Sequence, residues 1–194
     1  MRWNATLRVF DASSMIYAWD NYPITQFPSL WKWIASQIEQ QQLTMPVVAF
    51  DEVMPKTPDC GDWLKQQDIE LISISNAILQ DAVRIKSLIG IVNDNFHPKG
   101  VGENDILIIA AAKVEGADLV SDEERQIVSP VEPRKRKIPA VCGLPQVGVP
   151  CLASTSLNTS GVLGWSSVSR APITLGMILF KRQPKYDHIN KLTY

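Results

Sequence analysis

GENDILIIAAAKVEGADLVSDE, residues Gly102–Glu123, is the stretch of sequence that decides the fold. Its apolar run Ile106–Val114 predicts a helix that Asp105 opens and Gly116 ends, and Ala117–Val120 predicts a short strand. Three polar residues follow that strand directly: Ser121, Asp122 and Glu123. A helix cap would be a sufficient explanation for Asp105 alone. If the strand is parallel to its neighbours, however, its carboxyl end lies where open α/β sheets place their sites.

Two further apolar strands are expected to end in acidic residues. Leu7–Phe10 leads into Asp11, and Met45–Phe50 leads into Asp51 and Glu52. Asp11 fits two interpretations, an N-cap of the following helix or a metal ligand, and the sequence alone does not separate them. Of the second pair, Asp51 is the better helix cap, which leaves Glu52 as the better inward-facing ligand.

Short apolar strands alternate with longer helices along most of the chain. This alternation predicts an α/β fold with a mainly parallel sheet that helices cover on both faces. The other helices are expected over Pro28–Gln41, Asp62–Gln67, the long segment that Ser75 and Asn76 cap, and Ile138–Cys142. Glu70–Ile74 fits an edge strand or simply an apolar connection, and a further strand is expected over Val147–Leu152.

Length and charge limit the possible classes of protein. A chain of 194 residues with 45% hydrophobic content can bury one substantial core, so we expect one domain with an appended tail. The 19 basic residues nearly balance the 20 acidic ones, although Val168–Tyr194 is cationic. The start lacks a signal-peptide core, and no apolar run approaches the roughly 20 residues that span a bilayer. These features predict a cytoplasmic protein without membrane contact.

The chemistry that these residues favour is that of carboxylates. The sequence lacks GxGxxG after its first strand, GxxxxGK[ST] and GxSxG, which removes the main support for dinucleotide binding, P-loop hydrolysis and serine hydrolysis. Its three cysteines show no CxxC spacing, so neither a disulfide framework nor a zinc site is indicated. Several carboxylates brought together repel one another, and a divalent cation relieves that repulsion. Oxygen ligands of this kind favour Mg²⁺ or Mn²⁺.

Two groups of cations are candidates for substrate contact from their charge alone. Lys99 lies between glycines and polar residues in the expected loop Asn93–Gly102. Arg134, Lys135, Arg136 and Lys137 form a continuous basic run. Either group fits a solvated surface, and the run fits a contact with a nucleic-acid backbone equally well.

Together these sequence blocks resemble the PIN-domain nucleases, and within them a PIN-like group associated with bacterial toxin–antitoxin systems. The resemblance covers about residues 7–155. Its blocks are VFDASSMIYAW with FPSLWKWI, then DEV, then GENDILIIAAAKVEGADLVSDEE, and finally KIPAVC with VGVPCL. The first and third blocks together are fairly specific, whereas DEV alone is weak.

Carried over residue by residue, the resemblance implies an acidic metal site. Asp11 matches the family's first metal-binding aspartate, Glu52 the acid of the second block, and Asp105 the aspartate that starts the fourth-block helix. Ser13 matches the small polar residue after the first aspartate, and Ser121 matches the Thr or Ser of the strand-end motif. The last acid falls on Glu123, where the family often has aspartate, while Asp122 fills the variable position and stays an alternative.

The resemblance further implies a function. It is the hydrolysis of RNA phosphodiester bonds by a Mg²⁺- or Mn²⁺-dependent endoribonuclease, in which the ion activates a water for in-line attack. Toxins of this group are usually silenced by an antitoxin protein and often pair as homodimers. The implied fold is a three-layer α/β/α sandwich, PIN-like and Rossmann-like, over residues 1–160, with residues 161–194 as a C-terminal extension.

Two other functions stay open at this point. One is a catalytically inactive domain of the same fold that binds RNA or protein. The other is a different α/β enzyme that acts on a small phosphorylated substrate, for which a narrow closed pocket would be expected in place of an open groove.

Overall fold

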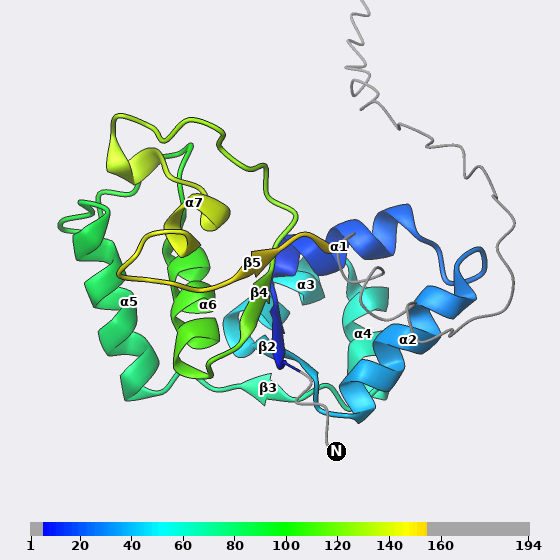
Figure 1. Ribbon diagram of the computed structural model, residues 1–194. Helices are drawn as coiled ribbons and strands as arrows, with labels where there is room; N and C mark the ends of the chain where they lie inside the picture. The colour runs from blue at the N-terminus through cyan, green and yellow to red at the C-terminus, as the bar shows by residue number, and fades with distance from the viewer. Residues whose placement is uncertain (1–5, 155–194) are drawn as a thin grey trace, which may run out of the picture. The chain divides into compact units, whose positions relative to one another are not determined.

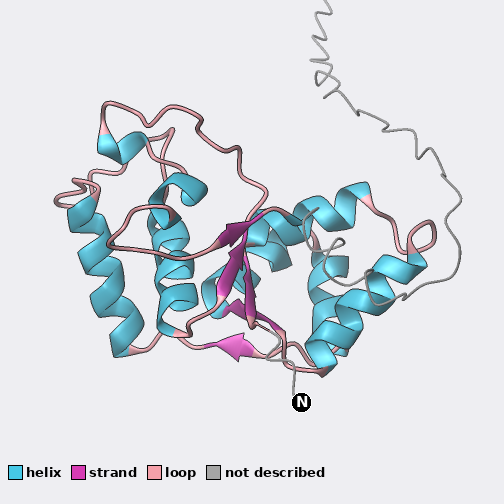
Figure 2. Ribbon diagram, in the orientation of Figure 1, coloured by secondary structure: helices cyan, strands magenta, loops and turns pink. Residues whose placement is uncertain are grey.

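The computed structural model describes residues 6–154, and its centre is a five-stranded sheet in the order β3-β2-β1-β4-β5. All four strand pairs are parallel. The strands are β1 (Arg8–Phe10), β2 (Leu43–Pro46), β3 (Leu71–Ile72), β4 (Asp118–Val120) and β5 (Cys151–Leu152). Figure 2 shows them stacked between two groups of helices. The predicted α/β class with a central parallel sheet is therefore confirmed.

Helices cover both faces of the sheet. They are α1 (Ala12–Asn21), α2 (Pro28–Glu39), α3 (Val47–Lys56), α4 (Pro58–Gln66), α5 (Asn76–Leu88), α6 (Glu103–Val114) and α7 (Ile138–Cys142), with one 3₁₀ turn, η1 (Pro133–Lys135). In Figure 1, α5 and α6 lie on one side of the strands, and α1, α2 and α4 lie on the other. The result is the three-layer α/β/α arrangement that the sequence blocks implied.

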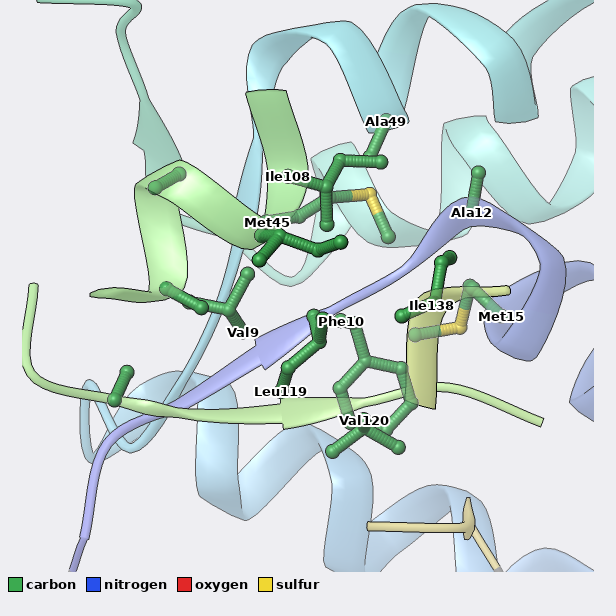
Figure 3. Packing of buried hydrophobic residues seen from close by; sticks show 14 of the residues in the cluster. Val9, Phe10, Ala12, Met15, Met45, Ala49, Ile108, Leu119, Val120 and Ile138 are labelled. Carbon is green, nitrogen blue, oxygen red and sulfur yellow. The ribbon is translucent and has the colours of Figure 1, made fainter. Parts of the chain in front are cut away.

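The core is built around β1 and β4. Val9 and Leu119 are fully buried at the centre of the sheet. Side chains from β2, α3, α6 and α7 gather around them in Figure 3. Helix α6 is apolar on most of its surface, and its residues Ile108–Ala112 are all buried, as expected for a helix enclosed by other elements. This burial fixes the position of both ends of α6.

The stretch Gly102–Glu123 forms the predicted helix and strand. Helix α6 begins at Glu103, two residues before Asp105, and Gly116 follows it with φ of +63°, a left-handed conformation that glycine adopts without strain. The chain then reverses into β4. Because α6 runs back along the sheet before β4 begins, the first turn of α6 lies at the same edge as the carboxyl end of β4. This edge carries Asp105 and Glu123 together.

The strand predicted over Met45–Phe50 is wrong beyond its first two residues. β2 ends at Pro46, and Val47 already starts α3. The run Val47–Phe50 is apolar because α3 buries one side against the core, and a short apolar run does not distinguish a buried helix from a strand. Asp51 consequently lies inside α3, so its predicted role as a helix cap is also wrong, and Glu52 comes from a helix and not from a strand end.

Other boundaries follow the sequence more closely. The expected edge strand and the Ser75 cap are present, since Ser75 Oγ accepts the Ile78 N–H at 3.3 Å. The strand predicted over Val147–Leu152 is reduced to its last two residues. Gly148 turns the chain with φ of +64°, and Pro150 has no N–H to donate, so before Cys151 the run reaches β4 through the Pro150 carbonyl, which accepts the Leu119 N–H at 2.8 Å.

Two loops beyond the sheet pack tightly against each other. The Val101 N–H donates to the Arg136 carbonyl at 3.0 Å, which joins the loop before α6 to the segment around η1. A Cβ at Gly100 would lie 1.9 Å from the Arg134 carbonyl oxygen, so only glycine fits there. The basic run is thereby held close to the start of α6.

None of the helices within residues 6–154 has both the length and the apolar character that crossing a bilayer requires. The expected extension 161–194 lies outside the described residues, and its division from the rest stays a prediction.

Candidate active site

Asp11 stands where β1 ends and α1 begins. Its backbone N–H donates to the Val120 carbonyl at 3.0 Å, which fixes it beside the end of β4, and only 3% of the residue is exposed. The Ser13 hydroxyl donates to Asp11 Oδ2, and the Ser121 hydroxyl lies 3.4 Å from the same oxygen. Asp11 thus has the chain position of an N-cap, but its hydrogen-bond partners are hydroxyls from two different elements. Parallel pairing of Phe10 with Val120 is what brings these residues together.

Asp105 lies in the first turn of α6. Its Oδ2 accepts the Gly102 N–H at 2.7 Å, which satisfies a backbone donor at the helix start. The carboxylate therefore does stabilise the helix, as the simpler interpretation required. That bond uses one of its two oxygens, and the other has no hydrogen-bond partner among the described residues.

Glu123 lies just beyond β4. Its Oε2 accepts the Ile138 N–H at 2.7 Å, so the first turn of α7 holds the side chain in place. Its neighbour Asp122 is held by other groups, because Asp122 Oδ1 accepts the Ser154 N–H at 2.8 Å. The Asp122 N–H donates to Ser14 Oγ, also at 2.8 Å.

Asp11, Asp105 and Glu123, which we call the acidic edge, affect one another electrostatically. Burial, together with the charges of Asp105 and Glu123, raises the pKa of Asp11 from 3.8 to about 6, against the opposing hydrogen bond from Ser13. Burial and then neighbouring negative charge also raise the pKa of Asp105 and that of Glu123, whose charged neighbour is Asp105. Asp122 is not among the charges that act on any of the three.

Glu52 approaches this edge from α3. Its Oε1 accepts the Asn104 side-chain N–H at 2.7 Å, and its Oε2 lies 3.3 Å from Lys56 Nζ. The charge of Glu52 contributes to the raised pKa of Asp105, whereas that of Lys56 lowers it. With Gly102, Glu103, Asn104 and Asp105, Glu52 lines a hollow that opens to the surface. Glu52 therefore meets the acidic edge at Asp105.

The acidic edge suits a divalent cation by charge and by donor type. One buried and two partly buried carboxylates oppose one another's ionisation, and all their donor atoms are oxygen, which Mg²⁺ and Mn²⁺ prefer. In the part of the chain that the structure describes, no three acidic, histidine or cysteine side chains are close enough to hold one ion as they stand. The fit is thus one of charge and chemistry, and closing on an ion would require the side chains to rotate.

The basic run Arg134–Lys137, which we call the basic loop, is largely paired with its own acids. Arg134 and Lys135 both bind Glu132, the latter at 3.0 Å, and Lys137 lies 3.7 Å from Glu124. Lys137 also lowers the pKa of Glu123, which places it near the acidic edge. Lys99 is exposed in its loop, and Arg136 makes no ion pair within residues 6–154.

Sequence reasoning missed three side chains at this edge. Asn104 and Lys56 hold the two oxygens of Glu52, and the fully buried Ser14 hydroxyl fixes the backbone after β4. Lys56 was detectable as the residue four positions after Glu52 on one helix. Asn104 stands directly before Asp105, but only the fold shows that it reaches α3.

The fold and this edge define an α/β protein with an acidic site at the carboxyl end of a parallel sheet. The family model described as "Domain of unknown function (DUF4411)" matches residues 9–159, and the chain belongs to this family. Among solved structures, the chain is similar to VapBC2 from Rickettsia felis bound to a DNA fragment from its promoter, with 16% identity and a TM-score of 0.46. That match covers 76% of this chain and 98% of the other. No curated protein gives a significant match.

Proposed function

We propose that this protein is a metal-dependent endoribonuclease that hydrolyses RNA phosphodiester bonds. The observation that carries the proposal is the acidic edge: Asp11, Asp105 and Glu123 come from three segments of the chain, and their charges act on one another in one place. A fold does not need three mutually repelling carboxylates, and strongly shifted acids are typical of functional sites. The resemblance of the sequence blocks to PIN-domain nucleases is the reason for proposing RNA hydrolysis as the reaction.

The residues divide the work as follows. Asp11, Asp105 and Glu123 would hold Mg²⁺ or Mn²⁺, with Glu52 at the margin near Asp105. When bound, a divalent cation lowers the pKa of water and offsets negative charge on a phosphodiester. Ser13 and Ser121 orient Asp11 through its Oδ2, which leaves Oδ1 directed elsewhere. No nucleophilic side chain is required, so we expect direct attack by water without a covalent intermediate.

The shape of the site favours a polymeric substrate. The hollow beside Glu52 and Asp105 opens to the surface, whereas an enzyme for a small phosphorylated molecule usually encloses its ligand. A cation near the acids, Lys137, can meet a phosphate of the bound strand. Lys99 and Arg136 are further candidates for such contacts.

The test is cleavage of single-stranded and structured RNA by the full chain with Mn²⁺, with Mg²⁺, and with a chelator. We expect cleavage with either metal, none with the chelator, and none by Asp11→Asn. Asp51→Asn is the matched control, because Asp51 is an exposed acid on α3 away from the acidic edge, and it should cleave like the parent. No cleavage by the parent under any condition, with unchanged Mn²⁺ binding by Asp11→Asn, would contradict the proposal.

The alternative is an inactive PIN-like domain that binds RNA or protein. The separation of the carboxylates in the described part of the chain favours it, since no three of them reach one ion as they stand. A protein that binds RNA equally well with and without Mn²⁺ and never cleaves it would support this alternative.

For the active enzyme, we further propose a role as a toxin whose activity a partner antitoxin suppresses. Growth arrest on expression of the parent but not of Asp11→Asn would test that role.

A further inference from the structure

Two thiols that the proposed reaction does not use lie beside the acidic edge. Cys142 is the last residue of α7, and Cys151 is the first residue of the edge strand β5. Each thiol is the largest influence on the pKa of the other, as expected for neighbouring side chains. The Val149 N–H donates to the Cys142 carbonyl at 3.2 Å, which brings the backbone before β5 against the end of α7. Both cysteines are free thiols in this structure.

The surroundings of the two thiols differ in a way that gives each a separate role. Cys151 is partly exposed, and Arg125 donates to its carbonyl oxygen at 2.8 Å, which keeps a guanidinium nearby. The neighbouring Cys142 thiol and the charge of Arg125 lower the pKa of the Cys151 thiol, and they outweigh its burial and the charges of the acidic edge. Cys142 is buried. The neighbouring Cys151 thiol and this burial raise the pKa of the Cys142 thiol. Cys151 is thus the thiol that a reagent in solution can reach first.

We propose that Cys142 and Cys151 are a redox modification site, which a hydroperoxide converts to an intrachain disulfide joining α7 to β5. Cys60 does not take part: it is fully buried in α4, and burial raises the pKa of its thiol to about 12. The proposal does not depend on the proposed nuclease function, since it rests on the thiols and their surroundings alone.

The chemistry balances in two steps. The Cys151 thiolate attacks one oxygen of the hydroperoxide, the O–O bond breaks, and Cys151 becomes a sulfenic acid while hydroxide or alkoxide leaves. The Cys142 sulfur then attacks the Cys151 sulfur, the S–O bond breaks, and water leaves with the Cys142 proton. The hydroperoxide is reduced by two electrons, and the two thiols together are oxidised by two.

The new bond would connect two supports of the acidic edge. The first turn of α7 donates the Ile138 N–H to Glu123, and β5 accepts the Ser121 N–H at the Leu152 carbonyl at 2.9 Å. In the reduced protein these supports are joined by the peptide segment 143–150 and by non-covalent contacts. Oxidation would therefore fix the elements that position Glu123 and Ser121 relative to each other.

The experiment treats the full native chain with hydrogen peroxide and counts thiols, then maps peptides without reduction. We expect the count to fall from three to one, with one Cys142–Cys151 linked peptide that dithiothreitol releases. Cys151→Ser should keep both remaining thiols reduced. Cys142→Ser should instead leave a sulfenic acid on Cys151 that a dione probe labels. Cys60→Ser is the control and should form the disulfide like the parent.

Three results would overturn the proposal: retention of all three thiols in the parent, linkage between molecules only, or equal thiol loss in Cys151→Ser. Alanine variants at the same positions repeat the test if a serine variant fails to fold, since they also remove sulfur without adding a hydroxyl. Because the readout is thiol number and peptide mass, a protein without nuclease activity gives an equally clear answer.

Discussion

The acidic edge and the basic loop are both clusters of charged residues, but they differ in whether ion pairs balance their charges. Asp11 is buried, Asp105 and Glu123 are partly buried, and no ion pair within residues 6–154 involves any of the three. Three of the four cations of the basic loop, Arg134, Lys135 and Lys137, instead form ion pairs with Glu132 or Glu124. A charged side chain that is paired with an opposite charge needs no ligand to account for it. A buried charge without such a partner is typical of a ligand-binding site.

This comparison inverts what the sequence suggests most directly. Four consecutive cations are the most conspicuous charged feature of the chain, yet most of their charge is offset by acids close by in sequence. The acids of the edge are isolated in sequence and conspicuous only in space. The following predictions test the contrast, beginning with the largest expected effect.

The sharpest test compares two adjacent acids. Glu123→Gln keeps an oxygen for the Ile138 N–H but removes the charge from the acidic edge, so we expect cleavage to fall by on the order of 10³-fold. Asp122→Asn likewise keeps an oxygen for the Ser154 N–H, and we expect it to retain most activity because Asp122 does not act on the other acids. RNA cleavage rates with Mn²⁺ measure both. Equal losses in the two variants would remove the distinction between Glu123 and Asp122.

The second test is the stability of the metal-free protein as a function of pH. Asp11 has a pKa of about 6 in the folded state and an ordinary value of 3.8, so between these values the folded protein binds more protons than the unfolded chain. Stability should therefore fall as pH rises through this window, by on the order of 3 kcal/mol from Asp11 alone. The raised pKa values of Asp105 and Glu123 act in the same direction.

Urea unfolding with a chelator present, at pH values from about 4 to 7, measures this dependence. Asp11→Asn should lose much of it and be more stable than the parent at neutral pH. Mn²⁺ should stabilise the parent at neutral pH and leave Asp11→Asn nearly unchanged. A parent that gains stability between the two pKa values would show that the acids of the edge are compensated after all.

The third test concerns Glu52, which meets the edge only at Asp105. Glu52→Gln keeps an acceptor for Asn104 and removes one charge, so we expect about a tenfold to hundredfold loss of metal affinity or activity. Asp51→Asn changes the neighbouring exposed acid of the same helix and should have no effect. Titration with Mn²⁺ under cleavage conditions distinguishes weaker binding from slower chemistry. A loss as large as that of Glu123→Gln would place Glu52 among the central acids.

The smallest effect is expected in the basic loop. Lys137→Ala should weaken RNA binding several-fold and reduce the slope of log affinity against log salt by about one, if Lys137 contacts one phosphate. Lys135→Ala is the control, because Lys135 is paired with Glu132 at 3.0 Å. RNA affinity is measured with each lysine variant combined with Asp11→Asn, so that the RNA is not cleaved during the measurement. Equal effects of the two lysine variants would make the loop a general electrostatic surface.

The sequence was sufficient for the fold class, and the acids that it singled out, Asp11, Asp105 and Glu123, act on one another's charge, while their role stays a prediction. The apolar run Ile106–Val114, which Gly116 ends, predicts a buried helix. Short apolar strands alternate with helices along the chain, and this alternation predicts parallel strands that helices cover. The position of Asp11 beside Ser121 then follows from the pairing of β1 with β4.

The remaining features depended on tertiary packing. Val47–Phe50 is apolar enough for a strand but is helical, because α3 packs one side of this run against the core. The contact of Asn104 with Glu52 spans more than fifty residues and needs the crossing of α3 and α6. Whether Asp122 or Glu123 faces the other acids depends on which one the α7 backbone binds, and no local pattern contains that information.

Asp105 serves both the folding of α6 and the proposed chemistry, through different oxygens of one carboxylate. Losing such a helix-start contact typically costs about 0.5–2 kcal/mol, so an alanine here would weaken the protein and the site at once. An asparagine would preserve the oxygen that the Gly102 N–H needs and remove only the charge. Of these two substitutions, only asparagine would remove the charge without also loosening the helix on which the centre of the molecule is assembled.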